Sequence, residues 1–280
     1  MKKSYCFGNV HLTIEADRDF EDGEQLNPFV FEEDGKITCS FKKADELILP
    51  EGKLVYASKS VRVFKTTGGF IKTYTMPLLN APAAVISKTD SGYYCEYDEK
   101  YADYFNTGVN LLNSIGIERI AFDAHMFIFH CSLVEYKGQA ILFTGVSGSG
   151  KSTRAEMWKK ELGAEIINGD KAGLFYENGT LMACGLPVAG SSGIFVKKSL
   201  PVRAVVTLKK ASDNSTRKAE ISEALKEVYY NMIVNKWDSV FSSEAVSFAA
   251  EILNHIYVYI SECNLDPSSV KEQLASLGID

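Results

Sequence analysis

Eight residues near the middle of the chain have the spacing of a phosphate-binding loop. They are Gly145, Val146, Ser147, Gly148, Ser149, Gly150, Lys151 and Ser152, and they fit the Walker A pattern of glycine, any four residues, then Gly-Lys-Ser or Gly-Lys-Thr. The glycines let the backbone turn successive N–H groups toward an anion. Lys151 supplies a mobile charge for the β- and γ-phosphates, and the Ser152 hydroxyl is suited to ligate magnesium. These residues, together with Thr153, predict a binding site for ATP and Mg²⁺.

The candidate for the second half of the site is a carboxylate that follows the loop by one helix and one strand. Asp170 ends the run Glu165-Ile166-Ile167-Asn168-Gly169. A carboxylate at the end of a strand beside the loop is the usual second magnesium ligand. We therefore expect Ser152 and Asp170 to share the metal and Asp170 to take part in catalysis. An aspartate that only forms a turn after Asn168-Gly169 is the alternative.

Other side chains are weaker candidates. His130 lies in an apolar stretch, where a histidine is more often a hydrogen-bonded core residue than a catalyst. Lys171, Arg154 and Arg203 could neutralise phosphate charge, although exposed basic residues need no functional explanation. The small-residue segment Gly185–Gly193 either lets its backbone approach a substrate or only connects two elements at the surface.

The elements that must position these residues change in character near residue 120. Residues 3–99 contain short segments of period two separated by Gly, Asp, Asn and Pro, a pattern that predicts antiparallel strands and turns. Clear examples are Val10–Ile14, Ile37–Phe41, Val61–Phe64 and Tyr93–Tyr97. Apolar residues at helical spacing between 104 and 126 predict two short helices separated at Gly116. We expect an N-terminal, mostly β domain over residues 1–120.

Residues 121–280 are expected to form the ATP-binding domain. A hairpin of Phe127–Glu135 and Gln139–Thr144 leads into the phosphate loop. The further expected elements are a helix at Lys151–Leu162, strands at Glu165–Ile167 and Val202–Leu208, a hairpin turn at Glu177–Gly179, and helices at Glu220–Met232, Ser243–Leu253 and Ser268–Leu277. This mixture predicts an α/β (α+β) fold class.

These motifs resemble the HPr kinase/phosphorylase family and its relatives, which are similar to ATP-dependent phosphoenolpyruvate carboxykinase at the nucleotide site. Three features carry the resemblance. His130 opens the strand-turn-strand hairpin, the loop has the form Gly-x-Ser-Gly-x-Gly-Lys-Ser, and an acidic motif follows one helix and one strand later. The resemblance implies a P-loop kinase domain of the HPr kinase type after a variable β-rich portion. It also implies catalytic roles for His130, Lys151 and Asp170.

The sequence departs from that family at one position of the acidic motif. Where the family has two adjacent aspartates, this chain has Gly169 and Asp170, so one carboxylate must do one task or both. The version Asn168-Gly169-Asp170-Lys171 and the segment Gly185–Gly193 look like those of HPr-kinase-related members. The C-terminal segment that HPr kinases use for phosphorolysis has no good match here. Because HPr kinases form oligomers, the resemblance leaves a homo-oligomer open.

Composition narrows the class of partner. The 280 residues carry a formal net charge of −6, which disfavours a nucleic-acid partner. Six cysteines lack paired spacing, which argues against a disulfide framework or a zinc site and favours free thiols in a reducing compartment. The N-terminus lacks the apolar core of a signal peptide, and the most apolar stretch, 120–134, is too short and polar to span a bilayer. We expect a cytoplasmic protein with no membrane partner.

The sequence thus favours an ATP-dependent phosphotransferase. The acceptor would be a hydroxyl on a protein or peptide serine or on a small metabolite. Two alternatives remain. One is a non-catalytic nucleotide-binding regulatory module, because Gly169 could mark a lost base. The other is a carboxykinase-like enzyme acting on oxaloacetate and phosphoenolpyruvate, although its full set of metal ligands is not evident in this chain.

Overall fold

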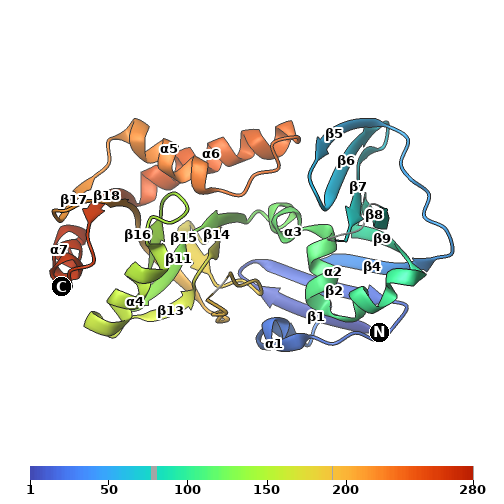
Figure 1. Cartoon of the computed structure of the whole chain (residues 1–280), viewed down its shortest axis with the longest axis horizontal. Coiled ribbons are helices and arrows are strands. Elements are labelled where there is room, and N and C mark those ends of the chain that lie inside the picture. The colour runs from blue at the N-terminus through green and yellow to red at the C-terminus, as the bar shows by residue number, and fades with distance from the viewer. Residues whose placement is uncertain (77–80, 191, 280) are drawn as a thin grey trace. The chain divides into compact units, whose positions relative to one another are not determined.

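The computed structural model describes residues 1–76, 81–190 and 192–279. The chain divides into two compact units, Met1–Ala124 and His125–Asp280 (Figure 1). Each unit contains helices and one large mixed sheet. The fold is therefore mixed α/β.

The first unit is built on a sheet of nine strands. In sheet order they are β3 (Val30–Phe31), β1 (Lys2–Phe7), β2 (Val10–Ala16), β4 (Ile37–Ala44), β9 (Gly92–Asp98), β8 (Pro82–Thr89), β7 (Gly69–Thr75), β6 (Val61–Thr66) and β5 (Lys53–Ala57). Alternate residues of β4, namely Ile37, Cys39 and Phe41, are buried, as a sheet with one covered face requires. The predicted strands in this part of the chain are confirmed.

One feature of this sheet differs from the predicted antiparallel arrangement. Strand β4 runs parallel to both of its neighbours, β2 and β9. Between β2 and β4 the chain passes through α1 (Gly23–Leu26), a short 3₁₀ turn (Asn27–Phe29) and β3, which pairs with β1. A crossover of this kind returns the chain to the end where β2 began, and the next strand is then parallel.

Helices α2 (Gly108–Ile115) and α3 (Ile117–Asp123) lie against this sheet after a 3₁₀ segment, Glu99–Asn106. Lys72 of β7 donates to the Ile115 carbonyl oxygen at 2.8 Å, and Tyr93 of β9 donates to the Asp123 carboxylate. Gly116 separates the helices with a φ of 94°, a conformation that favours glycine. The predicted helix break at Gly116 is confirmed.

The second unit is built on another sheet of nine strands. Seven of them follow the order β10 (Phe127–His130), β14 (Lys171–Glu177), β15 (Thr180–Cys184), β16 (Ser199–Lys210), β12 (Gln139–Thr144), β11 (Ser132–Tyr136) and β13 (Glu165–Asn168). Strand β18 (Tyr257–Cys263) also pairs with β16, and β17 (Ser215–Lys218) pairs with β18. Strand β12, which precedes the glycine-rich loop, is parallel to β16 and antiparallel to β11.

Four helices complete this unit: α4 (Lys151–Leu162), α5 (Ile221–Asn231), α6 (Ser239–His255) and α7 (Ser268–Leu277). All four were predicted. Helix α6 begins earlier than expected because the Asp238 carboxylate accepts hydrogen bonds from the N–H groups of Val240 and Phe241 and caps the helix.

The prediction of one continuous strand from Phe127 to Glu135 is wrong. The chain breaks at Cys131 into β10, which pairs with β14, and β11, which pairs with β12 and β13. Residues on both sides of the break are buried. An unbroken apolar run in the sequence therefore concealed a change of pairing partner.

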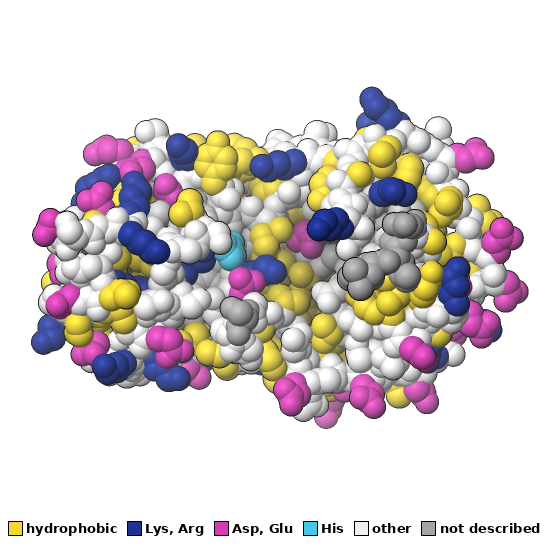
Figure 2. Space-filling model, in the orientation of Figure 1, with side chains coloured by type: hydrophobic (Ala, Val, Ile, Leu, Met, Phe, Trp, Pro, Cys, Tyr) yellow, Lys and Arg dark blue, Asp and Glu magenta, His cyan; other side chains and the backbone are white. Residues whose placement is uncertain are grey.

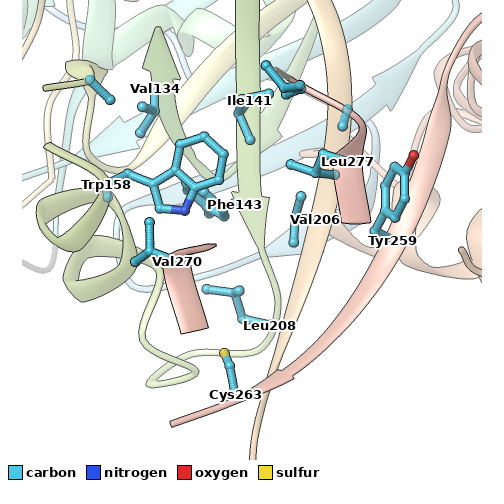
Figure 3. Close-up of a cluster of buried hydrophobic side chains, with 14 of the residues drawn as sticks. Val134, Ile141, Phe143, Trp158, Val206, Leu208, Tyr259, Cys263, Val270 and Leu277 are labelled. Carbon is cyan, nitrogen blue, oxygen red and sulfur yellow. The ribbon is translucent and has the colours of Figure 1, made fainter. Parts of the chain in front are cut away.

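Helices α4 and α7 cover one core of the second unit (Figure 3). Trp158 of α4 is fully buried beside Phe143 of β12, with ring centroids 5.3 Å apart. Its indole N–H donates to Gln273 Oε1 of α7 at 3.0 Å. Because a buried indole needs such a partner, this bond fixes α4, and with it the loop from which α4 begins.

Figure 2 shows Lys and Arg side chains interspersed with Asp and Glu on the visible face. None of the six cysteines, all of which lie in the described ranges, is in a disulfide, and five of them are buried. Across the described ranges, no helix combines the length and the apolar character needed to cross a bilayer.

Candidate functional site

The glycine-rich loop connects the end of β12 to the start of α4. Gly145, Gly148 and Gly150 have positive φ values of 133°, 77° and 100°, which favour glycine. A methyl group on Gly145 would also lie 2.9 Å from the Leu208 carbonyl oxygen, whereas one on Gly148 or Gly150 would meet nothing within 4 Å. Backbone conformation, rather than space, therefore requires glycine at the latter two positions.

Helix α4 presents its N-terminal N–H groups at this loop. The Arg154 N–H donates to the Gly150 carbonyl oxygen at 2.8 Å, so the N–H groups of Lys151, Ser152 and Thr153 precede the first bond within the helix. The side chains of Ser152 and Thr153 are exposed. The positive end of the helix dipole and these N–H groups together suit a phosphate group.

The Lys151 ammonium lies over the loop. It donates to the carbonyl oxygens of Gly145 at 3.0 Å and Val146 at 3.4 Å. Burial lowers the pKa of Lys151, while nearby Cys131 and Asp170 act in the opposite direction. The ammonium is thus held at the loop, and the charge of Asp170 acts on its pKa.

A hollow of about 600 Å³ adjoins the loop and the first turn of α4. It is also lined by Leu208 and Lys210 of β16 and by Asn264 and Leu265 after β18. Its volume is in the range of small-molecule sites, and apolar walls with a few polar groups are typical of them. The hollow therefore offers room for a ligand group attached to loop-bound phosphates.

The break between β10 and β11 faces a second break, between β13 and β14. His130 pairs with Lys171 on one side of the breaks and Leu133 with Asn168 on the other. Between them, the Cys131 N–H donates to the Asp170 carbonyl oxygen at 3.1 Å. The two breaks bring His130 and Asp170 together, although they are far apart in the sequence.

The Asp170 carboxylate lies between two nitrogen groups. Its Oδ1 is 3.6 Å from His130 Nδ1, and its Oδ2 is 3.4 Å from Lys171 Nζ. Burial, followed by the charge of Lys151, lowers the pKa of His130, and the Asp170 carboxylate only partly opposes this. Neutral imidazole is therefore favoured at neutral pH. The charges of Lys151 and Asp170 therefore act on His130 in opposite directions.

Three fully buried polar side chains join the segments of this site. Ser132 Oγ donates to the Gly169 carbonyl oxygen at 3.1 Å, and Thr144 Oγ1 donates to the His130 carbonyl oxygen at 2.8 Å. The Asn168 carboxamide bonds to the Asp170 turn and to the segment after β15. Sequence reasoning missed all three as site residues. The available signal was a polar residue at the end of an otherwise apolar strand.

The segment Gly185–Gly193 lies against Asp170 and is not a remote surface connection; Ser191 falls outside the described residues. A methyl group on Gly190 would lie 2.8 Å from both Cβ and Cγ of Asp170. The Ser192 side chain occupies the space that a Cβ on Gly169 would need. Ser192 therefore fills the space that a side chain at position 169 would occupy.

The structure corrects the expectation that Arg154 and Arg203 neutralise phosphate charge. Arg154 is 2% exposed and donates to Ser269 Oγ at 2.6 Å and to the Asn264 carbonyl oxygen at 2.8 Å. Arg203 donates to the Leu277 carbonyl oxygen at the end of α7 at 2.8 Å. Both guanidinium groups therefore hold α7 in place.

The two residues expected to bind a metal ion at this site both carry oxygen donors. Ser152 offers a hydroxyl and Asp170 a carboxylate, and magnesium prefers such donors while retaining water and phosphate oxygens as its other ligands. Within residues 1–76, 81–190 and 192–279, no group of three or more His, Cys, Asp or Glu side chains is placed to hold a metal. The residues present fit a magnesium ion that arrives with a nucleotide.

Comparison with known proteins adds little to what the geometry of the site indicates. No protein-family model matches the chain, and no curated protein matches it. Among solved structures, the Hpr(Ser) kinase/phosphatase from Coxiella burnetii aligns at 20% identity with a TM-score of 0.26, over 33% of this chain and 70% of that chain. At that TM-score, similarity alone supports neither a fold family nor a function.

Proposed function

We propose that this chain is an ATP-dependent kinase that transfers the γ-phosphoryl group to an acceptor hydroxyl. The acceptor would be a serine of a protein or peptide, or a small hydroxylated metabolite. The observation that carries the proposal is the approach of the Asp170 carboxylate to His130 Nδ1, at 3.6 Å, in the unit that also carries the phosphate loop and Lys151. A phosphate loop alone indicates binding, whereas a carboxylate and an imidazole beside it suit proton transfer.

The loop and α4 would bind the phosphates. The N–H groups of Lys151, Ser152 and Thr153 supply hydrogen bonds, and the Lys151 ammonium exchanges its bonds to the Gly145 and Val146 carbonyls for bonds to phosphate oxygens. Ser152 and Asp170 would hold magnesium, which when bound neutralises charge on the transferring group. Fixed positive groups of this kind lower the barrier because they need no reorganisation during the reaction.

Asp170 would orient the acceptor hydroxyl and accept its proton. Its Oδ1 faces His130, whose lowered pKa favours the neutral ring. A neutral imidazole can receive a proton from the Asp170 carboxyl group, or it can hold that carboxyl group toward the reacting oxygen by a hydrogen bond. His130 is thus suited to assist Asp170 without first losing a proton.

One observation favours the alternative of a non-catalytic nucleotide-binding module. Position 169 carries no side chain, and the space beside it is filled by Ser192. A site with a single carboxylate has fewer groups to divide between metal binding and proton transfer. The carboxykinase-like alternative predicts instead the manganese-dependent release of carbon dioxide from oxaloacetate.

The test is transfer of label from γ-labelled ATP with magnesium to a panel of acceptors. The panel contains serine-bearing peptides, the HPr protein and small hydroxylated metabolites, and Lys151→Ala is the control. Label on one acceptor that is lost in the control supports the kinase and identifies its substrate. If ATP binds but label appears neither on an acceptor nor in inorganic phosphate, the result supports the binding module. Release of carbon dioxide from oxaloacetate supports the carboxykinase.

A further inference from the structure

We propose that Asn168 is a positioning residue, which fixes the Asp170 carboxylate by joining its turn to the segment Leu186–Gly190. The inference rests on the proposed function in one respect, that Asp170 acts on the acceptor. The connection itself is independent of any activity. It is built from four hydrogen bonds and two close packing contacts.

The Asn168 side chain uses both ends of its carboxamide. Its Oδ1 accepts from the N–H groups of Asp170 and Lys171, each at 3.0 Å. Its Nδ2 donates to the carbonyl oxygens of Leu186 at 3.3 Å and Val188 at 2.9 Å. Since the side chain is fully buried, no water replaces a lost bond without rearrangement, and every broken bond leaves a buried polar group unsatisfied.

The segment held by Asn168 packs directly on Asp170. A methyl group on Gly190 would lie 2.8 Å from Asp170 Cβ and Cγ and 3.1 Å from Oδ1. Real Cβ atoms essentially never approach this closely, so only glycine allows the backbone to lie against the carboxyl group. The Gly190 backbone therefore packs directly against Asp170, and the hydrogen bonds of Asn168 determine the position of this backbone.

A second contact completes the connection on the other side of the turn. The Ser192 side chain fills the space beside Gly169, where any larger residue would meet Ser192 Cβ and Oγ. Ser192 Oγ also accepts from the Ile194 N–H at 3.3 Å. Gly169 is thus required by the position of the segment, in the same way that Gly190 is required by the position of Asp170.

The sharpest single change is Asn168→Asp. The new carboxylate keeps an oxygen for the Asp170 and Lys171 N–H groups but places its second oxygen against the Leu186 and Val188 carbonyls, which repel it. The connection to the segment is lost while the turn is retained. We expect kcat to fall by about tenfold or more, because small misplacement of a reacting group has effects of this size. KM for ATP should change by less than about twofold, since the four hydrogen bonds of the Asn168 side chain run to the Asp170 turn and to Leu186 and Val188 rather than to the phosphate loop.

Hydrogen exchange supplies a readout that does not depend on activity. In Asn168→Asp, amides of the peptide spanning residues 185–198 should exchange faster, because the bonds from Gly185 N–H to Lys198 O and from Val196 N–H to Ile167 O depend on the docked segment. Asn178 is exposed in the turn between β14 and β15. Asn178→Asp is therefore the matched control, and it should leave both kcat and the hydrogen exchange of residues 185–198 unchanged.

A rescue pair tests the packing contact. Gly169→Ala should lower kcat by about tenfold through its clash with Ser192, and the double change with Ser192→Gly should recover most of the loss. Gly68→Ala is the control, because its methyl group would meet only Thr66 Oγ1, at 4.0 Å. Parental kcat in Asn168→Asp, or no recovery in the double variant, would overturn the positioning role.

The outcomes separate the two proposals. If the parent protein transfers no phosphoryl group but Asn168→Asp still accelerates exchange over residues 185–198, the kinase assignment fails and the structural connection stands. If the parent is active and Asn168→Asp changes neither kcat nor exchange, the kinase stands and the positioning role fails. A loss of ATP affinity equal to the loss of kcat would also contradict it, because it would indicate general damage to the site.

Discussion

Single residues of the site differ in how burial and neighbouring charge act on them. Burial is the first cause of the lowered pKa of both Lys151 and His130, and the Lys151 charge is the second cause at His130. Burial also raises the pKa of the Cys131 thiol, which therefore stays protonated. Beside the phosphate loop the chain thus favours a neutral histidine and a neutral thiol at neutral pH.

The titration of His130 can be measured directly. We expect its imidazole to titrate below the ordinary value of about 6.5, and Lys151→Met should raise this pKa because removal of a positive charge favours the imidazolium. NMR of the ring protons, assigned with His130→Asn, gives both values. An imidazole pKa at or above the ordinary value, or one insensitive to Lys151→Met, would contradict the electrostatic coupling of the two residues.

The sequence reveals some of these residues better than others. Lys151 and Ser152 stand in a pattern of fixed spacing, and Asp170 follows an apolar strand, so residue type and order are enough to find them. Ser132, Thr144 and Asn168 act through bonds to residues distant in the sequence. The only local sign of these bonds is a polar residue at the end of an apolar strand. Only the three-dimensional pairing of the strands shows that these side chains belong to the site.

Helices and strands were predictable to different degrees. The helix at Lys151–Leu162 has its expected bounds, because a glycine-rich loop precedes it and Gly163 ends it with a φ of 71°. The end of a strand at Asn168-Gly169-Asp170 was predicted, but the break at Cys131 was not, since it depends on which strand pairs with which. The site lies at these breaks. Its geometry is therefore the part of the fold that periodicity cannot supply.

The attachment of α4 to α7 should govern the stability of the element that carries the loop. Arg154→Ala removes donors from Ser269 Oγ and the Asn264 carbonyl and leaves space in a buried region. We expect the free energy of unfolding to fall by about 2–4 kcal/mol in urea denaturation. Lys159→Ala, at an exposed position of the same helix, should change it by less than about 0.5 kcal/mol. Equal effects of the two changes would show that the buried bonds do not stabilise α4.

The whole molecule consists of two units, each with its own sheet and buried core. The glycine-rich loop, His130, Asp170 and the neighbouring hollow all belong to the unit His125–Asp280. Nothing in the proposed chemistry needs a residue of the unit Met1–Ala124.

This division predicts how ATP affects thermal unfolding. Mg²⁺-ATP at 100 times its Kd should stabilise the unit that binds it by about 2.7 kcal/mol. In calorimetry we therefore expect the transition of the second unit to move to higher temperature while that of the first does not, and Lys151→Ala should abolish the shift. A shift of both transitions by the same amount would show that the two units unfold together.

The central claim is that the loop binds ATP while Asp170 acts on the acceptor. Its most direct test is a parallel measurement of ATP affinity and γ-phosphoryl transfer in the parent, Lys151→Ala and Asp170→Asn. We predict that Asp170→Asn binds ATP within about threefold of the parent but transfers at least about 100-fold more slowly, whereas Lys151→Ala loses both. Transfer by Asp170→Asn at the parental rate would contradict the account.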